Sequence, residues 1–68
     1  MVERKYKKYG KTLEVNIHKP GEWEYQYSAA IIDKKGERIH TILASYWKDI
    51  ILFARKHHFK LRKSDLEI

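Results

Sequence analysis

The residues of this chain that could do chemistry are mostly basic, and they gather near its two ends. Among 68 residues, 15 are Lys or Arg and 9 are Asp or Glu, so the formal net charge is +6. Residues 1–11 carry a net charge of +4 and residues 55–63 carry +5, whereas residues 12–54 carry −1. Such clustering favours a polyanionic partner. The basic residues of the two blocks are Arg4, Lys5, Lys7, Lys8, Lys11, Arg55, Lys56, Lys60, Arg62 and Lys63.

The spacing within the first block indicates a way of holding a nucleic acid. Lysines alternate there with Tyr6 and Tyr9, so the cations could follow phosphates while a ring packs on a sugar or base. We therefore expect a small basic accessory or regulatory protein that binds nucleic acid, with DNA ahead of RNA. Two solvated chain ends would explain the same charge pattern and stay open as an alternative.

Chemistry that needs a catalytic group, a metal or a cofactor has little support. There is no Cys, no Gly-rich phosphate loop and no nucleophile elbow. His57 and His58 are adjacent, so on a helix they would point apart. His18 and His40 could meet across strands, but a structural zinc site needs four ligands. We expect no enzyme activity, no metal and no cofactor, and histidines that titrate near neutrality and modulate anion affinity.

The hydropathy pattern predicts no membrane association. No apolar run approaches the roughly 20 residues of a membrane helix. The opening MVERKYKKYGK is not followed by the apolar stretch of a secretory signal. We expect a cytoplasmic protein.

The spacing of apolar residues predicts the strands and the helix that position the basic residues. Alternating apolar residues predict strands over 12–18, 22–33 and 37–43, with a hairpin turn at Asp33-Lys34-Lys35-Gly36. The segment SYWKDIILFARKHHF predicts a helix of about four turns with Ser45 as its N-cap. The fold class is therefore α+β, a three-stranded antiparallel sheet with one C-terminal helix packed on one face. Residues 1–11 would be a flexible basic arm, 12–61 the domain, and 62–68 a tail of uncertain structure.

One face of the sheet must be core, because a single helix covers only one side. Burying aromatic rings gains more than burying unpaired glutamates, so the aromatic column of the central strand is assigned to the core. The expected core columns are Leu13, Val15, Ile17; Trp23, Tyr25, Tyr27, Ala29, Ile31; and Ile39, Thr41, Leu43.

The central region resembles a known DNA-binding layout. Trp23-x-Tyr25, the turn Asp33–Gly36 followed by Arg38, and the helix SYWKDIILFARKHH are similar to the AP2-like arm-site domain of tyrosine recombinases. In that family residues of the sheet enter the major groove and basic residues flank it. The resemblance implies base contacts by Gln26 and Arg38, on a reading face that also holds Ser28 and His40. Glu22 and Glu24 depart from the pattern, because phosphates would repel them.

A second hypothesis belongs to a different class of protein. The mixed-charge sheet face and an open edge strand also suit a protein-interaction module, such as a small regulator or inhibitor that docks on an acidic partner. Self-association through an edge strand, giving a homo-oligomer, is a related expectation.

Overall fold

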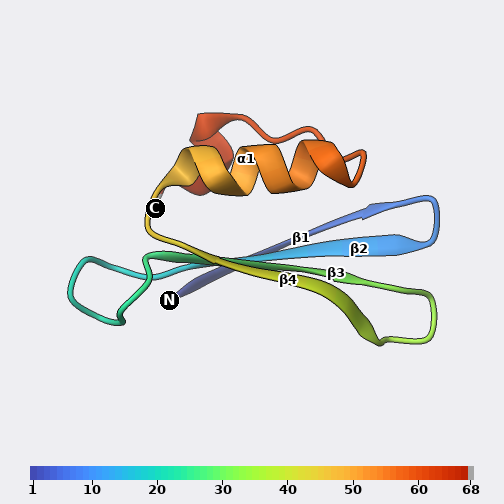
Figure 1. The fold of residues 1–68 in the computed structure, drawn as a ribbon, viewed down its shortest axis with the longest axis horizontal. Helices are drawn as coiled ribbons and strands as arrows, with labels where there is room; N and C mark the ends of the chain where they lie inside the picture. The colour runs from blue at the N-terminus through green and yellow to red at the C-terminus, as the bar shows by residue number, and fades with distance from the viewer. Residues whose placement is uncertain (68) are drawn as a thin grey trace.

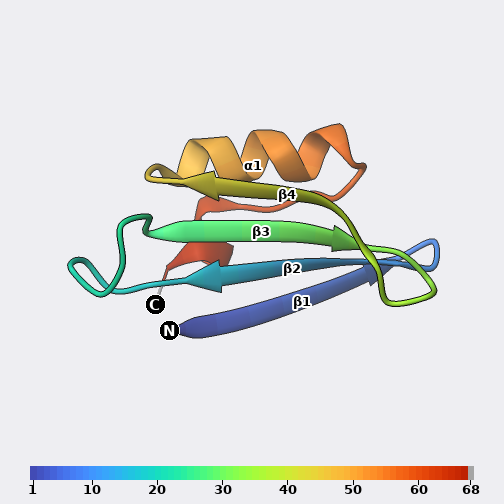
Figure 2. The same ribbon diagram turned by 60° about the horizontal axis from the view of Figure 1, so that its bottom comes forward.

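The computed structural model describes residues 1–67 and forms an antiparallel sheet with a helical layer on one face (Figure 1). The four strands lie side by side in chain order, and the helix and the C-terminal segment cover one side of them (Figure 2). The elements are β1 (Val2–Lys8), β2 (Lys11–Ile17), β3 (Tyr27–Ile32), β4 (Arg38–Ala44), α1 (Trp47–Lys56) and the 3₁₀ helix η1 (Lys63–Leu66). The α+β class and the helix packed on one face are confirmed, but the sheet has four strands rather than three.

The additional strand, β1, occupies the segment that we expected to be a flexible arm. It pairs with β2 along its length, from Val2 opposite Ile17 to Lys8 opposite Lys11. Tyr9 and Gly10 close this hairpin with positive φ angles of 52° and 76°, as a two-residue type I′ turn requires. The many charged residues of β1 hide the alternation of apolar and polar residues that would predict a strand. Charged residues are common in edge strands, because they prevent pairing with a further strand.

The core lies between the sheet and the helical layer. The side chains of Leu13, Val15, Ile17, Ile31 and Ile50 are fully buried. The C-terminal segment also contributes, and its buried residues are Phe59, Leu61 and Leu66. The tail therefore belongs to the fold as far as Glu67, while residue 68 of the predicted tail lies outside the described residues.

The central strand is shorter than the sequence predicts, because its first five residues form a loop. Glu22 accepts a hydrogen bond at Oε2 from the Lys19 backbone N–H at 3.1 Å, which stabilises a turn instead of a strand. Trp23 packs its ring on His18 at a centroid distance of 4.9 Å and stays 47% exposed. The assignment of Trp23 to the core is therefore wrong, whereas that of Tyr27 is confirmed, since Tyr27 is 7% exposed.

The last strand presents the face opposite to the predicted one. Its pairing places Ala44 beside Tyr27 and Ile42 beside Ala29, so these residues continue the core column of β3. Leu43 lies on the open face and is 47% exposed, and Ile39, at the bulge between the Ile31–His40 and Ile32–Arg38 pairs, is 42% exposed. Both columns of β4 contain apolar residues, and only the register with β3 decides between them.

The helix and the second hairpin follow their sequence signals in part. The turn after β3 is confirmed, since Gly36 has φ of 87° and Asp33 Oδ1 accepts hydrogen bonds from the N–H groups of Lys35 and Glu37. The helix spans ten residues and has Tyr46 at its N-cap without a side-chain cap bond. The prediction of a Ser45 cap and of about four turns is therefore wrong.

Candidate nucleic-acid interface

The end of the sheet that carries both hairpin turns holds a group of lysines. In an up-and-down antiparallel sheet the β1–β2 turn and the β3–β4 turn lie at the same end (Figure 2). A hollow of about 410 Å³ between them is lined by Lys7, Lys8, Lys11 and Lys34, around Tyr9 and Gly10. We call these four residues the lysine turn. The single acid of its lining is Asp33, and Asp33 Oδ1 already accepts two backbone hydrogen bonds.

Gly10 allows the two turns to approach each other. A Cβ built on this residue would lie 2.4 Å from Cε of Lys34, so the lysine chain crosses the space that a side chain would need. The positive φ of Gly10 independently favours glycine. Close contact of the two turns brings Lys34, from the middle of the sequence, beside lysines of the first block.

The lysine turn continues into the C-terminal part of the chain. Lys8 Nζ donates a hydrogen bond to the backbone carbonyl of His58 at 3.1 Å. A small hollow of about 60 Å³ lies between Lys8, Tyr9 and Lys11 on one side and His57, His58 and Phe59 on the other. Phe59 also lines a third hollow of about 350 Å³, with Arg55 and Lys60 at its rim. The first and second hollows share Lys8, Tyr9 and Lys11, and the second and third share Phe59 alone.

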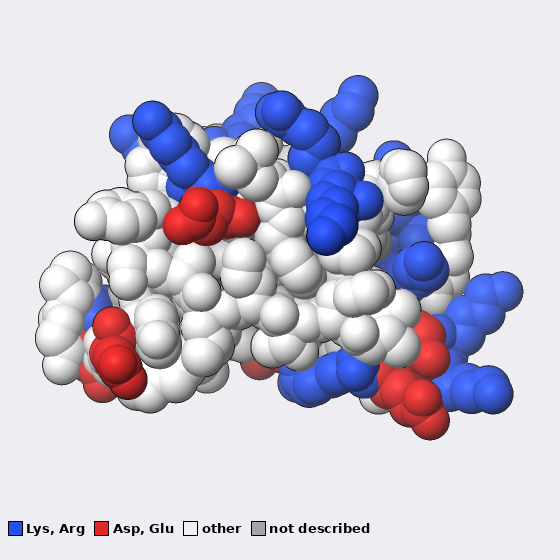
Figure 3. All heavy atoms as spheres, viewed as in Figure 1, with Lys and Arg blue, Asp and Glu red and all other residues white. Residues whose placement is uncertain are grey.

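We call this chain of hollows the basic path. Six cationic side chains line it and one acid does, and among the described residues none of the six cations forms a salt bridge. Figure 3 shows Lys and Arg side chains along the helical layer and at the end of the sheet with the β1–β2 turn. The cations of the basic path are Lys7, Lys8, Lys11, Lys34, Arg55 and Lys60.

Two histidines meet where the path passes between the sheet and the helix. The rings of His40 on β4 and His57 after α1 lie 4.3 Å apart at 31°. Burial, and then the positive neighbours His40, Lys56, Lys11 and His58, lower the pKa of His57. A bound anion would oppose the repulsion by these positive neighbours, so it would favour protonation of His57.

The exposed aromatic residue of the path is Tyr9. Its side chain is 84% exposed, and Lys8 Nζ lies 5.3 Å from the ring centroid. Tyr6, the other tyrosine of the first block, packs against the core instead, and its burial, followed by the nearby Asp65, raises its pKa. Only Tyr9 of this pair is therefore free to stack on a base or sugar.

Other predicted site residues are engaged elsewhere in the fold. Arg4 donates from Nη2 to the Glu67 carbonyl at 2.8 Å, which ties β1 to the C-terminal segment. Lys63 lies over the Trp47 ring at 5.1 Å. The chain therefore turns back after residue 60, and Lys63 lies at the start of α1 rather than beside Arg55. Arg62 and Lys56 are exposed but do not line the path.

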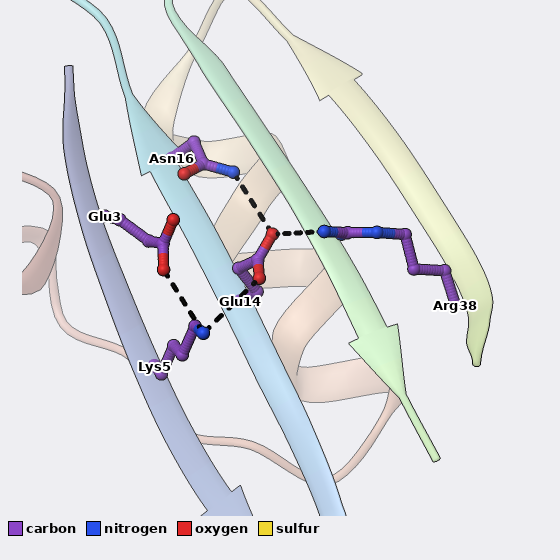
Figure 4. Close-up of polar contacts among 5 residues, drawn as sticks. All are labelled: Glu3, Lys5, Glu14, Asn16 and Arg38. Atoms are coloured by element: carbon purple, nitrogen blue, oxygen red, sulfur yellow. Dashed lines mark hydrogen bonds and ion pairs between the residues drawn. The ribbon is translucent and has the colours of Figure 1, made fainter. Parts of the chain in front are cut away.

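The open face of the sheet neutralises its own charge (Figure 4). Glu14 is only 6% exposed, and its Oε1 lies 2.9 Å from Nη2 of Arg38. Lys5 Nζ approaches Oε2 of Glu14 at 4.0 Å and Glu3 at 3.3 Å. Asn16 completes the group with a 3.5 Å hydrogen bond to Glu14. Lys5 and Arg38 are thus ion-paired on the open face, and neither lines the basic path.

The residues expected to read bases are spread along the sheet and over both of its faces. Gln26 precedes β3 in the loop, and Arg38 pairs with Ile32 at the other end of that strand, about 20 Å away at strand spacing. Ser28 lies on the open face, whereas His40 faces the helix and stacks on His57. At the loop end, Glu22 forms a salt bridge with the N-terminal amine at 3.2 Å. The Lys19 backbone bond, followed by that amine, lowers the pKa of Glu22.

Lys34 is the site residue that sequence reasoning missed. Lys34 lies in the sequence Asp33-Lys34-Lys35-Gly36, which we interpreted only as a hairpin turn. The expected three-stranded sheet had no β1–β2 turn, so nothing placed other lysines next to Lys34. Recognising Tyr9-Gly10 as a type I′ turn would have found it, because the meander then places both turns at one end.

Comparison with known proteins gave no match for this chain. No family model matches it, and no curated protein and no solved structure matches either. Among residues 1–67 no three His, Cys, Asp or Glu side chains are grouped to hold a metal ion. The same part of the chain contains no helix long and apolar enough to cross a membrane.

Proposed function

We propose that this protein binds nucleic acid along the basic path. The observation that supports the proposal is a series of three hollows linked by shared lining residues, whose linings together hold six cations and one engaged acid. The two basic blocks are far apart in sequence, and the Lys8–His58 hydrogen bond joins them. A polyphosphate backbone is the ligand whose charge extends along such a path.

Binding through these cations would contact the phosphate backbone of the nucleic acid and would not distinguish its base sequence. Phosphate contacts position a nucleic acid, while specificity needs contacts with base edges. Gln26 and Arg38 lie outside the path, so we infer sequence-tolerant binding. DNA is the first probe, and exposed Tyr9 adds a stacking surface that favours unpaired bases.

The experiment compares two double variants with the same net charge. Lys11→Gln with Lys34→Gln removes two cations from the path, whereas Lys19→Gln with Lys48→Gln removes two elsewhere. If both path lysines meet phosphates, affinity for duplex DNA in 0.1 M salt should fall roughly 60-fold in the first variant. The second should change affinity by about twofold or less, through net charge alone. Equal losses in the two variants would refute a localised interface.

An acidic protein partner is the alternative that uses the same cations. It has no bases to stack, so Tyr9→Ala should weaken binding to single-stranded DNA and leave an acidic protein bound. Pull-down from a lysate with and without nuclease separates the two, because partners bridged by nucleic acid are lost after digestion.

A further inference from the structure

The outer edge of β4 is an unpaired strand without charged protection. The sheet order ends at β4, and Arg38 through Thr41 are exposed, as is Leu43. Arg38 is its only formally charged residue, and Glu14 holds that side chain over the open face. The other edge, β1, carries five charged residues, Glu3, Arg4, Lys5, Lys7 and Lys8, and it also donates hydrogen bonds to the C-terminal segment. Charged edges resist pairing, so β4 is the edge open to another strand.

The side chains of β4 complement those of a second β4 in antiparallel orientation. In a register centred on Thr41, Ile39 lies opposite Leu43 of the second copy, and His40 lies opposite Ile42. Ile39 and Leu43 are 42% and 47% exposed in one copy. Leu43 pairs with Ser28 on the open face, and Ile39 lies at the bulge between the Ile31–His40 and Ile32–Arg38 pairs. Residues directly opposite in an antiparallel pair have Cβ atoms about 4.5–5.5 Å apart, so the two apolar side chains would cover each other.

The flank of α1 beside β4 adds charge complementarity. His57 at the end of α1 stacks on His40 of β4, and Phe53 contacts His57 at 4.8 Å, so this flank faces the β4 side. Asp49, Phe53 and Lys56 follow one another at helical spacing along it. A two-fold axis would run the two helices antiparallel, with Asp49 of each facing Lys56 of the other.

We propose that two copies of this chain pair through β4 in the register centred on Thr41. The product is a continuous eight-stranded antiparallel sheet with both α1 helices on one face and the two-fold axis normal to the sheet. Such an interface is isologous, since the same patch serves both copies. The proposal does not rest on nucleic-acid binding, because the basic path ends at the hairpin turns and the C-terminal segment.

The experiment uses single-cysteine variants, which are unambiguous because the chain has no Cys. Thr41→Cys places two sulfur-bearing residues directly opposite, with Cα atoms about 4.5–5.5 Å apart, within disulfide reach. In Leu43→Cys the two cysteines are four strand positions apart, about 13 Å, too far to bridge. Leu52→Cys on the outer face of α1 reports random collisions, since Leu52 is 57% exposed.

Under mild oxidation Thr41→Cys should form a disulfide-linked dimer at least tenfold faster than the other two variants. Sedimentation of the unmodified protein should give twice the 8.3 kDa chain mass, and Leu43→Lys should return it to 8.3 kDa while Leu52→Lys should not. Circular dichroism of each variant checks that it is folded. A monomer at millimolar concentration, or equal crosslinking of all three cysteine variants, would overturn the proposal.

Discussion

Replacing Arg38 by Gln tests whether this residue supports the sheet or contacts nucleic acid. Its guanidinium lies 2.9 Å from Glu14, whose side chain is 8% exposed. Without Arg38, the remaining cation near Glu14 is Lys5 at 4.0 Å. Because the Glu14 carboxylate is buried, removing its closest charged partner should lower the free energy of unfolding of the protein.

The magnitude follows from the exposure of the two groups. A hydrogen bond to a charged group contributes about 1.5–3 kcal/mol when it is shielded from water. The Arg38 side chain is 55% exposed, so solvent screening reduces this to about 1 kcal/mol. In a domain of this size, 1 kcal/mol lowers Tm by roughly 4–8 °C.

The assay pairs thermal unfolding by circular dichroism with DNA binding by fluorescence anisotropy. Lys35→Gln is the matched control, because it makes the same change in net charge on an exposed turn residue. Arg38→Gln should lower Tm relative to this control and change DNA affinity by no more than the control does. Unchanged stability together with a tenfold loss of affinity would refute the structural role and restore Arg38 as a nucleic-acid contact.

Three further expectations concern the core, the lysine turn and the histidine pair. Ile50→Ala, at a fully buried site, should cost about 2–5 kcal/mol in urea unfolding; a cost below 1 kcal/mol would contradict the described core. Gly10→Ala should destabilise by about 1–2 kcal/mol through its positive φ, and Gly36→Ala by a similar amount, because the flexible Lys34 side chain can move away from the new Cβ at residue 10; an unchanged stability of both variants would argue against the two described turns. Because the folded pKa of His57 is lowered, the unfolded chain binds a proton first, so the free energy of unfolding should fall as pH drops from 7 to 5.5. His57→Phe should flatten that slope in denaturant titrations at each pH, and an identical slope would exclude His57 as the cause.

The spacing of apolar residues correctly predicted a strand at β2 and a helix at α1, because in these segments it fits only one kind of secondary structure. The alternation of Leu13, Val15 and Ile17 and the helical spacing of Ile50 and Ala54 correspond to buried residues. It missed β1, whose partly buried apolar residues are only Val2 and Tyr6. An edge strand needs few apolar residues, because its backbone pairs on one side and its charges face water.

The faces and the site depended on contacts that no local pattern contains. Both columns of β4 carry apolar side chains, so the position of Leu43 follows from pairing with Ser28. Lys34 joins the site through the contact of two hairpin turns. The exposure of Trp23 follows from a loop hydrogen bond that competes with strand pairing. Each of these outcomes is tertiary in origin.

The dependence of DNA affinity on salt tests the central proposal most directly. Six phosphate contacts along the basic path give a slope of log K against log salt of about −5 on duplex DNA. Affinity should then fall roughly a thousandfold between 50 and 200 mM salt, as measured by anisotropy with a labelled duplex. No binding at 50 mM salt, or a slope near zero, would contradict the account.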